Sequence, residues 1–208
     1  MALATLALCL ATAAAHPLTG QVAGSRVQAP GADRITRRLQ NISPRSGPPG
    51  THVTVASALM PHITPVRVGM GATRIGFEAL AELLTSVNGD FSVEVTVPEW
   101  ARWDRNHRFI LFDFYFNPIA ASDPFYVTDA DGRLRREGVM SSELPRCTAM
   151  RDLDGELFAI TGDAATLARY KTGDRVVVTG TLADASDCGE APTLRITEIR
   201  APTAATRN

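Results

Sequence analysis

Short stretches of alternating apolar and polar residues, each bounded by turn residues, run through the first two thirds of the chain. The alternation is clearest at residues 52–56 and 91–97, and residues 65–69 and 124–128 follow the same pattern. A period of two predicts β-strands that bury one face. Residues 109–116 are almost continuously apolar and aromatic, so we expect a central strand there that is largely buried.

Residues 75–87 fit either a helix or a strand, and the sequence leaves this choice open. The helix face would hold Phe77, Leu80, Leu84 and Val87, and the strand face would hold Phe77, Ala79, Ala81 and Leu83. The tripeptide at residues 88–90, Asn-Gly-Asp, predicts a hairpin turn. Strands separated by turns at intervals of roughly ten residues predict an antiparallel sandwich.

A second group of strands is predicted beyond a short junction at residues 129–133. Its five members are residues 134–140, 147–152, 157–161, 175–182 and 193–199. Residues 163–169 could form one short helix after the third strand. Five strands with a helix after the third are the order of an OB-type barrel, and we expect the fifth strand to close against the first.

Both units resemble known bacterial families. The motif at residues 43–55, the Asn-Gly-Asp hairpin and the last strand at 124–128 resemble Ig-like domains of the IPT/TIG kind, over about residues 41–128. In the second unit the matching residues are Cys147, the stretch 154–163, the glycine-containing stretch 173–180 and Cys188 before the apolar positions of 193–199. On these residues, positions 134–200 resemble an uncharacterised family of small exported OB-like domains. These resemblances imply an all-β fold, an Ig-like sandwich followed by a small five-stranded barrel. They also imply an extracytoplasmic setting but no activity.

The first 15 residues form an uncharged apolar run that ends in three alanines, which is typical of an export signal cleaved after Ala15. The run lacks the usual leading Lys or Arg, so a buried helix or a disordered Ala-rich arm remains an alternative. It is too short for a permanent membrane span. Residues 16–40 are polar and basic, and we expect a flexible leader there, as well as a disordered tail at residues 201–208.

The chain has three cysteines, and removal of the signal would take Cys9 with it. The remaining pair, Cys147 and Cys188, fits one disulfide formed in an oxidising compartment. Two unrelated buried thiols are the alternative. The OB-like resemblance also implies that these two cysteines pair. We therefore expect a periplasmic or extracellular protein.

Composition excludes several classes of function. The 208 residues carry a net charge of −1 and are 45% hydrophobic, which is typical of a globular chain. Residues 134–200 hold nine basic and eleven acidic side chains, a balance of −2, and their only aromatic residues are Phe158 and Tyr170. Because single-stranded nucleic acid requires positive charge and stacking aromatics, we expect no nucleic-acid partner.

Motif searches find no phosphate-binding loop, zinc-protease helix or nucleophile elbow, so we expect no cofactor and no catalytic or metal site. Two Asp-x-Asp-Gly runs, at residues 129–132 and 152–155, have the wrong spacing for a calcium loop and are interpreted as turns. The histidines are scattered. Gly69 and Gly71 miss the dinucleotide fingerprint and are interpreted as a glycine turn.

The remaining candidate for a ligand patch is formed by Trp100, Arg102 and Trp103. Two tryptophans beside arginines could stack on a sugar or a peptide, but covering one end of the sandwich core is the preferred interpretation. The predicted function is non-catalytic binding to an envelope protein or polysaccharide. A hydrolase of envelope polymers is the alternative, and it would need Asp113, Asp152 or Asp154 to converge in a cleft.

Overall fold

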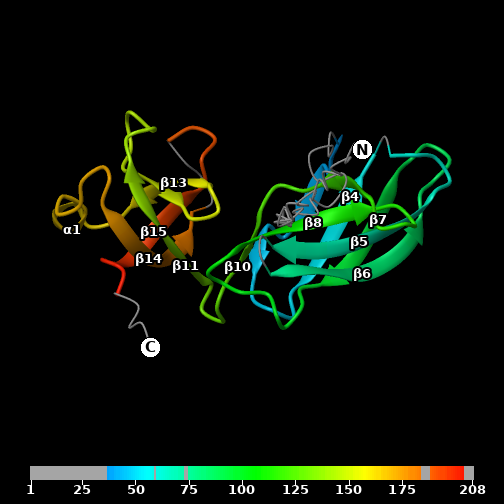
Figure 1. Cartoon of the computed structure of the whole chain (residues 1–208), viewed down its shortest axis with the longest axis horizontal. Coiled ribbons are helices and arrows are strands. Elements are labelled where there is room, and N and C mark those ends of the chain that lie inside the picture. The colour runs from blue at the N-terminus through cyan, green and yellow to red at the C-terminus, as the bar shows by residue number, and fades with distance from the viewer. Residues whose placement is uncertain (1–36, 59, 73–74, 184–187, 204–208) are drawn as a thin grey trace, which may run out of the picture. The chain divides into compact units, whose positions relative to one another are not determined.

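The computed structural model describes residues 37–58, 60–72, 75–183 and 188–203, and the fold is nearly all β, as predicted (Figure 1). A three-stranded sheet has the order β2 (Asn41–Ser43), β4 (His52–Ser57), β7 (Phe91–Thr96). A seven-stranded sheet contains β1 (Arg37–Arg38), β3 (Ser46–Gly47), β5 (Pro65–Ala72), β6 (Gly76–Leu84), β8 (Asn106–Phe112), β9 (Pro118–Ala121) and β10 (Phe125–Val127). In this sheet β5 lies between β6 and β8.

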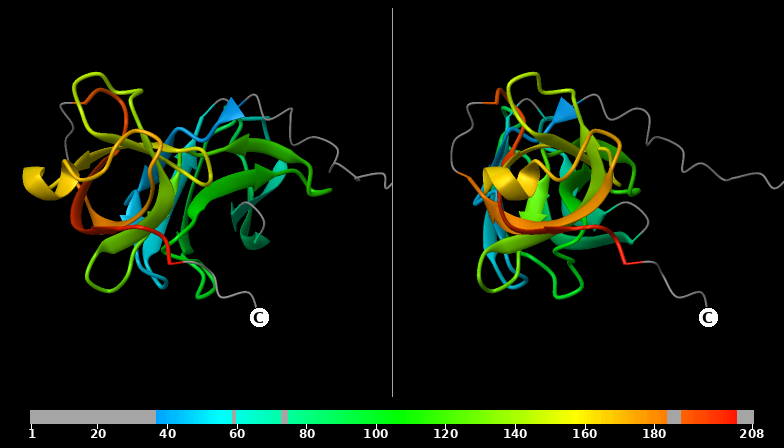
Figure 2. Two further views of the ribbon diagram at one scale, coloured as in Figure 1. Left: turned by 60° about the vertical axis from the view of Figure 1, so that its left-hand side comes forward. Right: turned by 90° about the vertical axis from the view of Figure 1, so that its left-hand side faces the viewer.

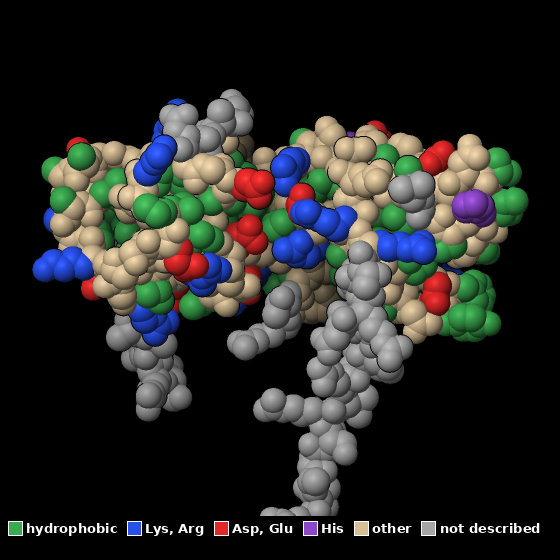
Figure 3. Space-filling model, turned by 90° about the horizontal axis from the view of Figure 1, so that it is seen from above, with side chains coloured by type: hydrophobic (Ala, Val, Ile, Leu, Met, Phe, Trp, Pro, Cys, Tyr) green, Lys and Arg blue, Asp and Glu red, His purple; other side chains and the backbone are tan. Residues whose placement is uncertain are grey.

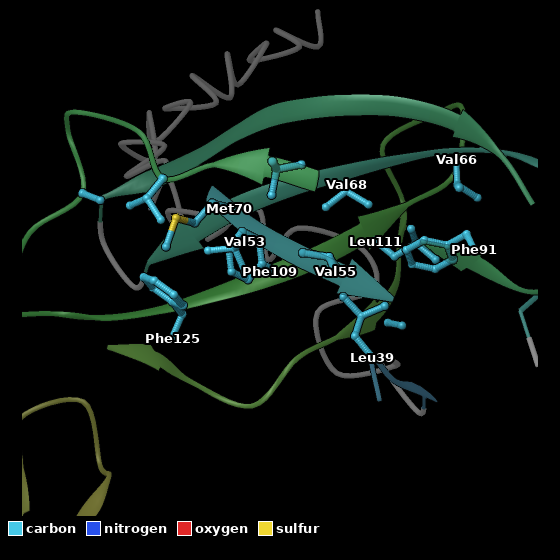
Figure 4. Close-up of a cluster of buried hydrophobic side chains, with 14 of the residues drawn as sticks. Leu39, Val53, Val55, Val66, Val68, Met70, Phe91, Phe109, Leu111 and Phe125 are labelled. Atoms are coloured by element: carbon cyan, nitrogen blue, oxygen red, sulfur yellow. The ribbon is translucent and has the colours of Figure 1, made fainter. Parts of the chain in front are cut away.

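The two sheets pack face to face around one apolar core, which Figure 4 shows in close-up. Val53 and Val55 project from β4 toward Val68 on β5 and toward Phe109 and Leu111 on β8, and all five side chains are fully buried. On each strand, the residues that alternate with these core residues face outward, because successive side chains in a strand point to opposite faces. The alternation in the sequence therefore identifies the core side of each strand.

Residues 76–84 form a strand, which decides the choice that the sequence left open. The pairing of β6 with β5 shifts register between Val68 and Gly69, so that Leu80 is an extra residue in β6. Such a β-bulge changes which residues face the core. Ala81 and Leu83 pack against the core cluster, whereas Phe77 and Ala79 are exposed. The predicted strand face is thus divided at the bulge.

The Asn-Gly-Asp turn forms, but it does not join two paired strands. β6 pairs with β5 in one sheet and β7 pairs with β4 in the other, so the turn carries the chain between sheets. Gly89 has φ +79°, and a Cβ there would lie 2.1 Å from the carbonyl oxygen of Met60. Only glycine fits this close approach. The presence of Gly89 is therefore explained by its backbone conformation and its contact with Met60, although the turn does not form a hairpin.

The second unit is a closed barrel with the order β11 (Arg133–Ser141), β12 (Ala149–Asp152), β13 (Leu157–Thr161), β15 (Thr193–Arg200), β14 (Arg175–Leu182). In Figure 2 these strands curve around one interior. The helix α1 (Ala164–Leu167) follows β13 as predicted, and Asp163 caps its N-terminus. The expected closure was wrong: β14 pairs with β11, and β15 pairs with β13 in parallel.

The start of the sandwich lies earlier than the sequence predicted. β1 pairs with β9, and Leu39 is buried in the sandwich core, although both fall in the predicted leader. Pairing with an existing strand supplies the stability that a polar segment lacks by itself. The predicted signal at residues 1–15, its cleavage after Ala15 and the rest of the leader lie outside the described residues, as does the end of the tail.

Candidate functional site

The outer face of the seven-stranded sheet carries aromatic side chains around Arg67. On β5, Arg67, Gly69 and Gly71 alternate with the core residues Val66, Val68 and Met70, so they lie on the outer side of the strand, where both glycines are covered by neighbouring residues. A Cβ on Gly69 would lie 3.3 Å from the ring of Phe112, and a Cβ on Gly71 would lie 3.1 Å from the Cβ of Phe77. The two glycines therefore leave room for aromatic rings across β5, and they lie in a strand rather than in the turn that the sequence predicted.

A tight turn between β8 and β9 presents three further aromatic residues. Asp113 Oδ1 accepts hydrogen bonds from the backbone N–H groups of Tyr115 and Asn117, both at 2.8 Å, and Oδ2 accepts one from the Asn117 amide. Burial opposes ionisation, but these hydrogen bonds outweigh it and lower the pKa of Asp113. Phe116 adopts φ +62°, which only a well-determined turn imposes on such a residue.

The prediction of a buried strand over residues 109–116 is therefore wrong beyond Phe112. The strand ends at Phe112, and the Asp113 carboxylate accepts hydrogen bonds from the backbone N–H groups of the turn that follows. Asp and Asn favour such local bonds to the backbone, and Asp113, Asn117 and Pro118 are the signal that could have indicated the turn. The apolar and aromatic residues on both sides of Asp113 obscured this signal.

Arg67 holds the turn against the sheet. Its Nη1 donates to the carbonyl oxygen of Phe114 at 2.6 Å, and its Nε donates to Glu82 Oε1 at 2.6 Å. The guanidinium carbon lies 4.4 Å from the ring centre of Phe116 and 5.1 Å from that of Phe114. Cation–π contact on two rings and two hydrogen bonds fix the position of this turn relative to β5 and β6.

Four aromatic residues remain exposed on this face, and we call them the aromatic surface. The exposed fractions are 51% for Phe77, 60% for Phe114, 79% for Tyr115 and 47% for Phe116. Phe112 is buried beneath them, with its ring centre 4.8 Å from that of Phe77. A cavity of about 280 Å³ borders the surface, and its lining includes Leu84 and Phe114. Clustered exposed aromatics on a rigid framework are typical of interaction sites.

The rings of the aromatic surface do not share a plane. Phe77 and Phe116 are tilted by 49° with their centres 6.1 Å apart, and Phe114 and Tyr115 are nearly perpendicular at 89°. Arg67 already lies over the rings of Phe114 and Phe116. A flat sugar ring needs an open aromatic face on which to stack, so this arrangement suits irregular apolar side chains better than a polysaccharide.

The residues of the predicted ligand patch lie elsewhere on the sandwich. Trp100 and Trp103 are half-buried and pack against the core cluster, and Trp100 Nε1 donates to Glu78. Arg102 is exposed and forms two hydrogen bonds to Asp104, at 2.8 and 2.9 Å. The tryptophans thus contact the sandwich core, which matches the preferred interpretation from the sequence.

A buried charged cluster lies where β11 meets the loop that follows Trp100. Arg136 is 1% exposed, and its guanidinium donates to the carbonyl oxygens of Trp103 and Arg105. Its Nε lies 3.7 Å from Asp152 Oδ2. Burial lowers the pKa of Arg136, and burial also raises the pKa of Asp152, against the opposing effect of Arg136 itself. No pattern in the sequence indicates this cluster.

His107 lies fully buried beside this cluster. Its Nδ1 lies 3.1 Å from the Arg105 carbonyl oxygen, and the Arg102 N–H donates to Nε2 at 3.3 Å. This arrangement assigns the neutral tautomer with its proton on Nδ1. Burial lowers the pKa of His107 to about 4. The imidazole therefore serves the fold as a neutral hydrogen-bonding group near pH 7.

The acids proposed for a hydrolase are held in structural roles. Asp152 accepts from the N–H groups of Asp154 and Glu156, and Asn106 bonds to both aspartates. Asp113 lies in the turn described above. The cavity beside Asp152 measures about 50 Å³, which is far below the size of a usual ligand site.

Both Asp-x-Asp-Gly runs form turns. In each, the first Asp accepts from the backbone N–H groups two and four residues later, at 2.8 to 3.0 Å. Across the described ranges, no three His, Cys, Asp or Glu side chains gather as a metal site would require.

A disulfide joins Cys147 and Cys188, with 5.9 Å between the Cα atoms, as predicted. It links the β11–β12 connection to the β14–β15 connection at one end of the barrel. In the part of the chain that the structure describes, no helix has the length and apolar character needed to cross a membrane. No model of a known protein family matches this chain, and no curated protein is significantly similar to it.

Proposed function

We propose that this chain is an exported, non-catalytic binding protein that docks a protein partner on the aromatic surface. The observation that carries the proposal is the rigid presentation of Phe77, Phe114, Tyr115 and Phe116 outside the core. Single exposed apolar residues are common, but four adjacent exposed aromatics held by one ion pair, cation–π contacts and a carboxylate turn are not. Such residues are frequent anchors of protein interfaces.

The surrounding charge favours a protein over nucleic acid. One face of the protein, shown in Figure 3, carries acidic and basic side chains beside one another. At the aromatic surface, Arg67 is already paired with Glu82, and Asp113 adds a further carboxylate, so the local charge does not favour phosphate groups. A hydrolase gains no support from the positions of Asp113, Asp152 and Asp154.

We further propose that the sandwich is Ig-like of the IPT/TIG kind and that the barrel is OB-like. The order of β11 to β15, with the third strand parallel to the fifth and a helix after the third, supports the second assignment. Export is supported by the disulfide and by the apolar start of the sequence. N-terminal sequencing of the protein from its native host should begin at His16, and an intact start would contradict export by this signal.

The docking function is tested with a Phe114→Ser/Tyr115→Ser variant of the full chain. Envelope extract is separated into protein and polysaccharide fractions, and each component retained by the wild type is purified and its Kd measured. Removing the two aromatic anchors should raise the Kd for the protein partner at least tenfold, because aromatic anchors commonly supply much of the binding energy of an interface. Leu153→Ser, which changes an exposed apolar residue on the barrel, is the matched control.

Three outcomes would contradict this function. The first is a retained protein whose affinity is unchanged in the double variant, and the second is equal loss in the Leu153→Ser control. The third is a polysaccharide that depends on the same aromatic residues. Circular dichroism of both variants establishes that the sheets are intact, because the substituted side chains lie outside the core.

A further inference from the structure

The outer edge of the seven-stranded sheet is formed by β6, one of the two longest strands. Within the described residues β6 pairs only with β5, and Figure 1 shows it at the border of the sheet. An edge strand presents unpaired backbone N–H and C=O groups that can bind another extended chain. Natural edges are commonly protected by Lys, Pro or a β-bulge. Gly76–Leu84 contains neither Lys nor Pro, and its bulge at Leu80 leaves residues 81–84 regular.

The other long edge, β7, offers no comparable surface. Its exposed residues, Ser92, Glu94 and Thr96, are polar. β6 instead borders the aromatic surface through Phe77 and carries the exposed Leu84 at its end. Backbone pairing can therefore be combined with apolar side-chain contact along β6 and not along β7.

The bulge at Leu80 selects the part of β6 that an incoming strand would follow. It divides the edge into Gly76–Ala79 and the regular stretch 81–84. The second stretch borders the cavity of about 280 Å³, which is lined by Leu84 and Phe114 and is large enough for an aliphatic or aromatic side chain.

The charge along this edge has one sign. Glu78 and Glu82 are the only charged residues of β6. The Glu82 side chain is 71% exposed, whereas Arg67, its partner, is only 15% exposed. The exposed charge at this position is therefore the Glu82 carboxylate, because the Arg67 guanidinium is largely covered. An exposed carboxylate favours a basic side chain on the partner.

We propose that the partner inserts an extended segment as an added strand along residues 81–84 of β6. One of its apolar side chains enters the cavity beside Leu84 and Phe114, and a Lys or Arg pairs with Glu82. This inference rests on the proposed docking function and specifies the form of the partner. It makes the aromatic surface and the β6 edge two halves of one site.

The test uses the full chain and a displayed library of random ten-residue peptides. Selected peptides should alternate apolar residues with Lys or Arg, and their binding should slow amide exchange in residues 81–84. Glu82→Lys should weaken peptide binding by roughly tenfold, because the attraction between Glu82 and the basic peptide residue is replaced by repulsion between two positive charges. Replacement of Lys or Arg by Glu in the peptide should restore affinity for Glu82→Lys.

Glu94→Lys, on the outer face of β7, is the matched control and should leave affinity unchanged. The inference is overturned by selected peptides that protect another strand, by equal loss in the control, or by failure to select any peptide. Sedimentation that shows a dimer through β6 would make a second copy the occupant and also overturn it. A partner that depends on Phe114 and Tyr115 but neither protects β6 nor responds to Glu82→Lys would leave the docking function standing and refute the added strand.

Discussion

Replacing Arg136 with Met should destabilise the protein more than any surface substitution. Arg136 is buried, and it satisfies the carbonyl oxygens of Trp103 and Arg105 while compensating the charge of Asp152. Met fills a similar volume but supplies neither donors nor charge. The substitution therefore leaves the carbonyl oxygens of Trp103, Arg105 and Arg135, and the carboxylate of Asp152, without the partner they have in the folded state.

The expected loss follows from the burial of the pair. Removing one member of a buried ion pair costs about 3–5 kcal/mol, because the other charge remains desolvated. For a chain of this size each kcal/mol lowers Tm by about 2–4 °C, so Tm should fall by roughly 10 °C. Because Asp152 Oδ1 accepts from Asp154 and Glu156, an Asp152→Asn variant keeps the turn while removing the charge.

The assay is urea unfolding of the full chain, followed by tryptophan fluorescence and far-ultraviolet circular dichroism. Trp103 reports directly, since its carbonyl accepts from Arg136. The Arg136→Met/Asp152→Asn double variant should lose less than the sum of the single losses, by about 1 kcal/mol or more. Arg133→Met, on the same strand but exposed, should be neutral. A loss below about 1 kcal/mol for Arg136→Met, or additive losses in the cycle, would refute the reasoning.

Three further predictions concern the disulfide, the buried histidine and the strand β5. Replacing Cys147 and Cys188 with Ser should lower stability by about 4 kcal/mol in calorimetry, since the bridge spans 41 residues; Tm unaffected by the change would contradict this. His107 has a folded pKa of about 4, below the usual 6.5, so the unfolded state binds its proton first as pH falls. Stability should therefore decrease by about 3 kcal/mol from pH 6.5 to 4, and His107→Gln should remove this slope in pH-dependent urea unfolding. Gly69→Ala places a Cβ 2.5 Å from the carbonyl oxygen of Glu78, and unfolding should show a loss of about 1–3 kcal/mol rather than the gain usual for Ala in a strand.

Local sequence determined which segments are strands and which residues of most strands face the core. Val53 and Val55 alternate with polar neighbours, and this alternation alone indicates their burial. The five barrel strands and the helix after the third were likewise evident from periodicity and from turn residues. These features depend on neighbours in the chain, and a single sequence contains that information.

The candidate site could not be predicted in the same way, because its two main features contradict the local pattern. The run 109–116 is apolar or aromatic except for Asp113, yet the turn at Asp113 exposes the end of the run, where aromatic residues contact Arg67 from another strand. The bulge at Leu80 leaves Phe77 exposed, while Ala81 is partly buried against the core. Neither outcome depends on hydrophobicity alone.

Pairing between distant segments was decided by tertiary structure. The sequence predicted a disulfide between Cys147 and Cys188 from their number and from a family resemblance, but the strand order that brings them together required the closed barrel. The burial of Arg136 is the extreme case. An arginine in an alternating strand is expected to face water. Arg136 is buried here because carbonyl groups of other segments accept from its terminal nitrogens and Asp152 compensates its charge. The sequence pattern shows which residues are polar. Whether a charged residue is buried depends on partners from distant segments, which only the folded chain brings together.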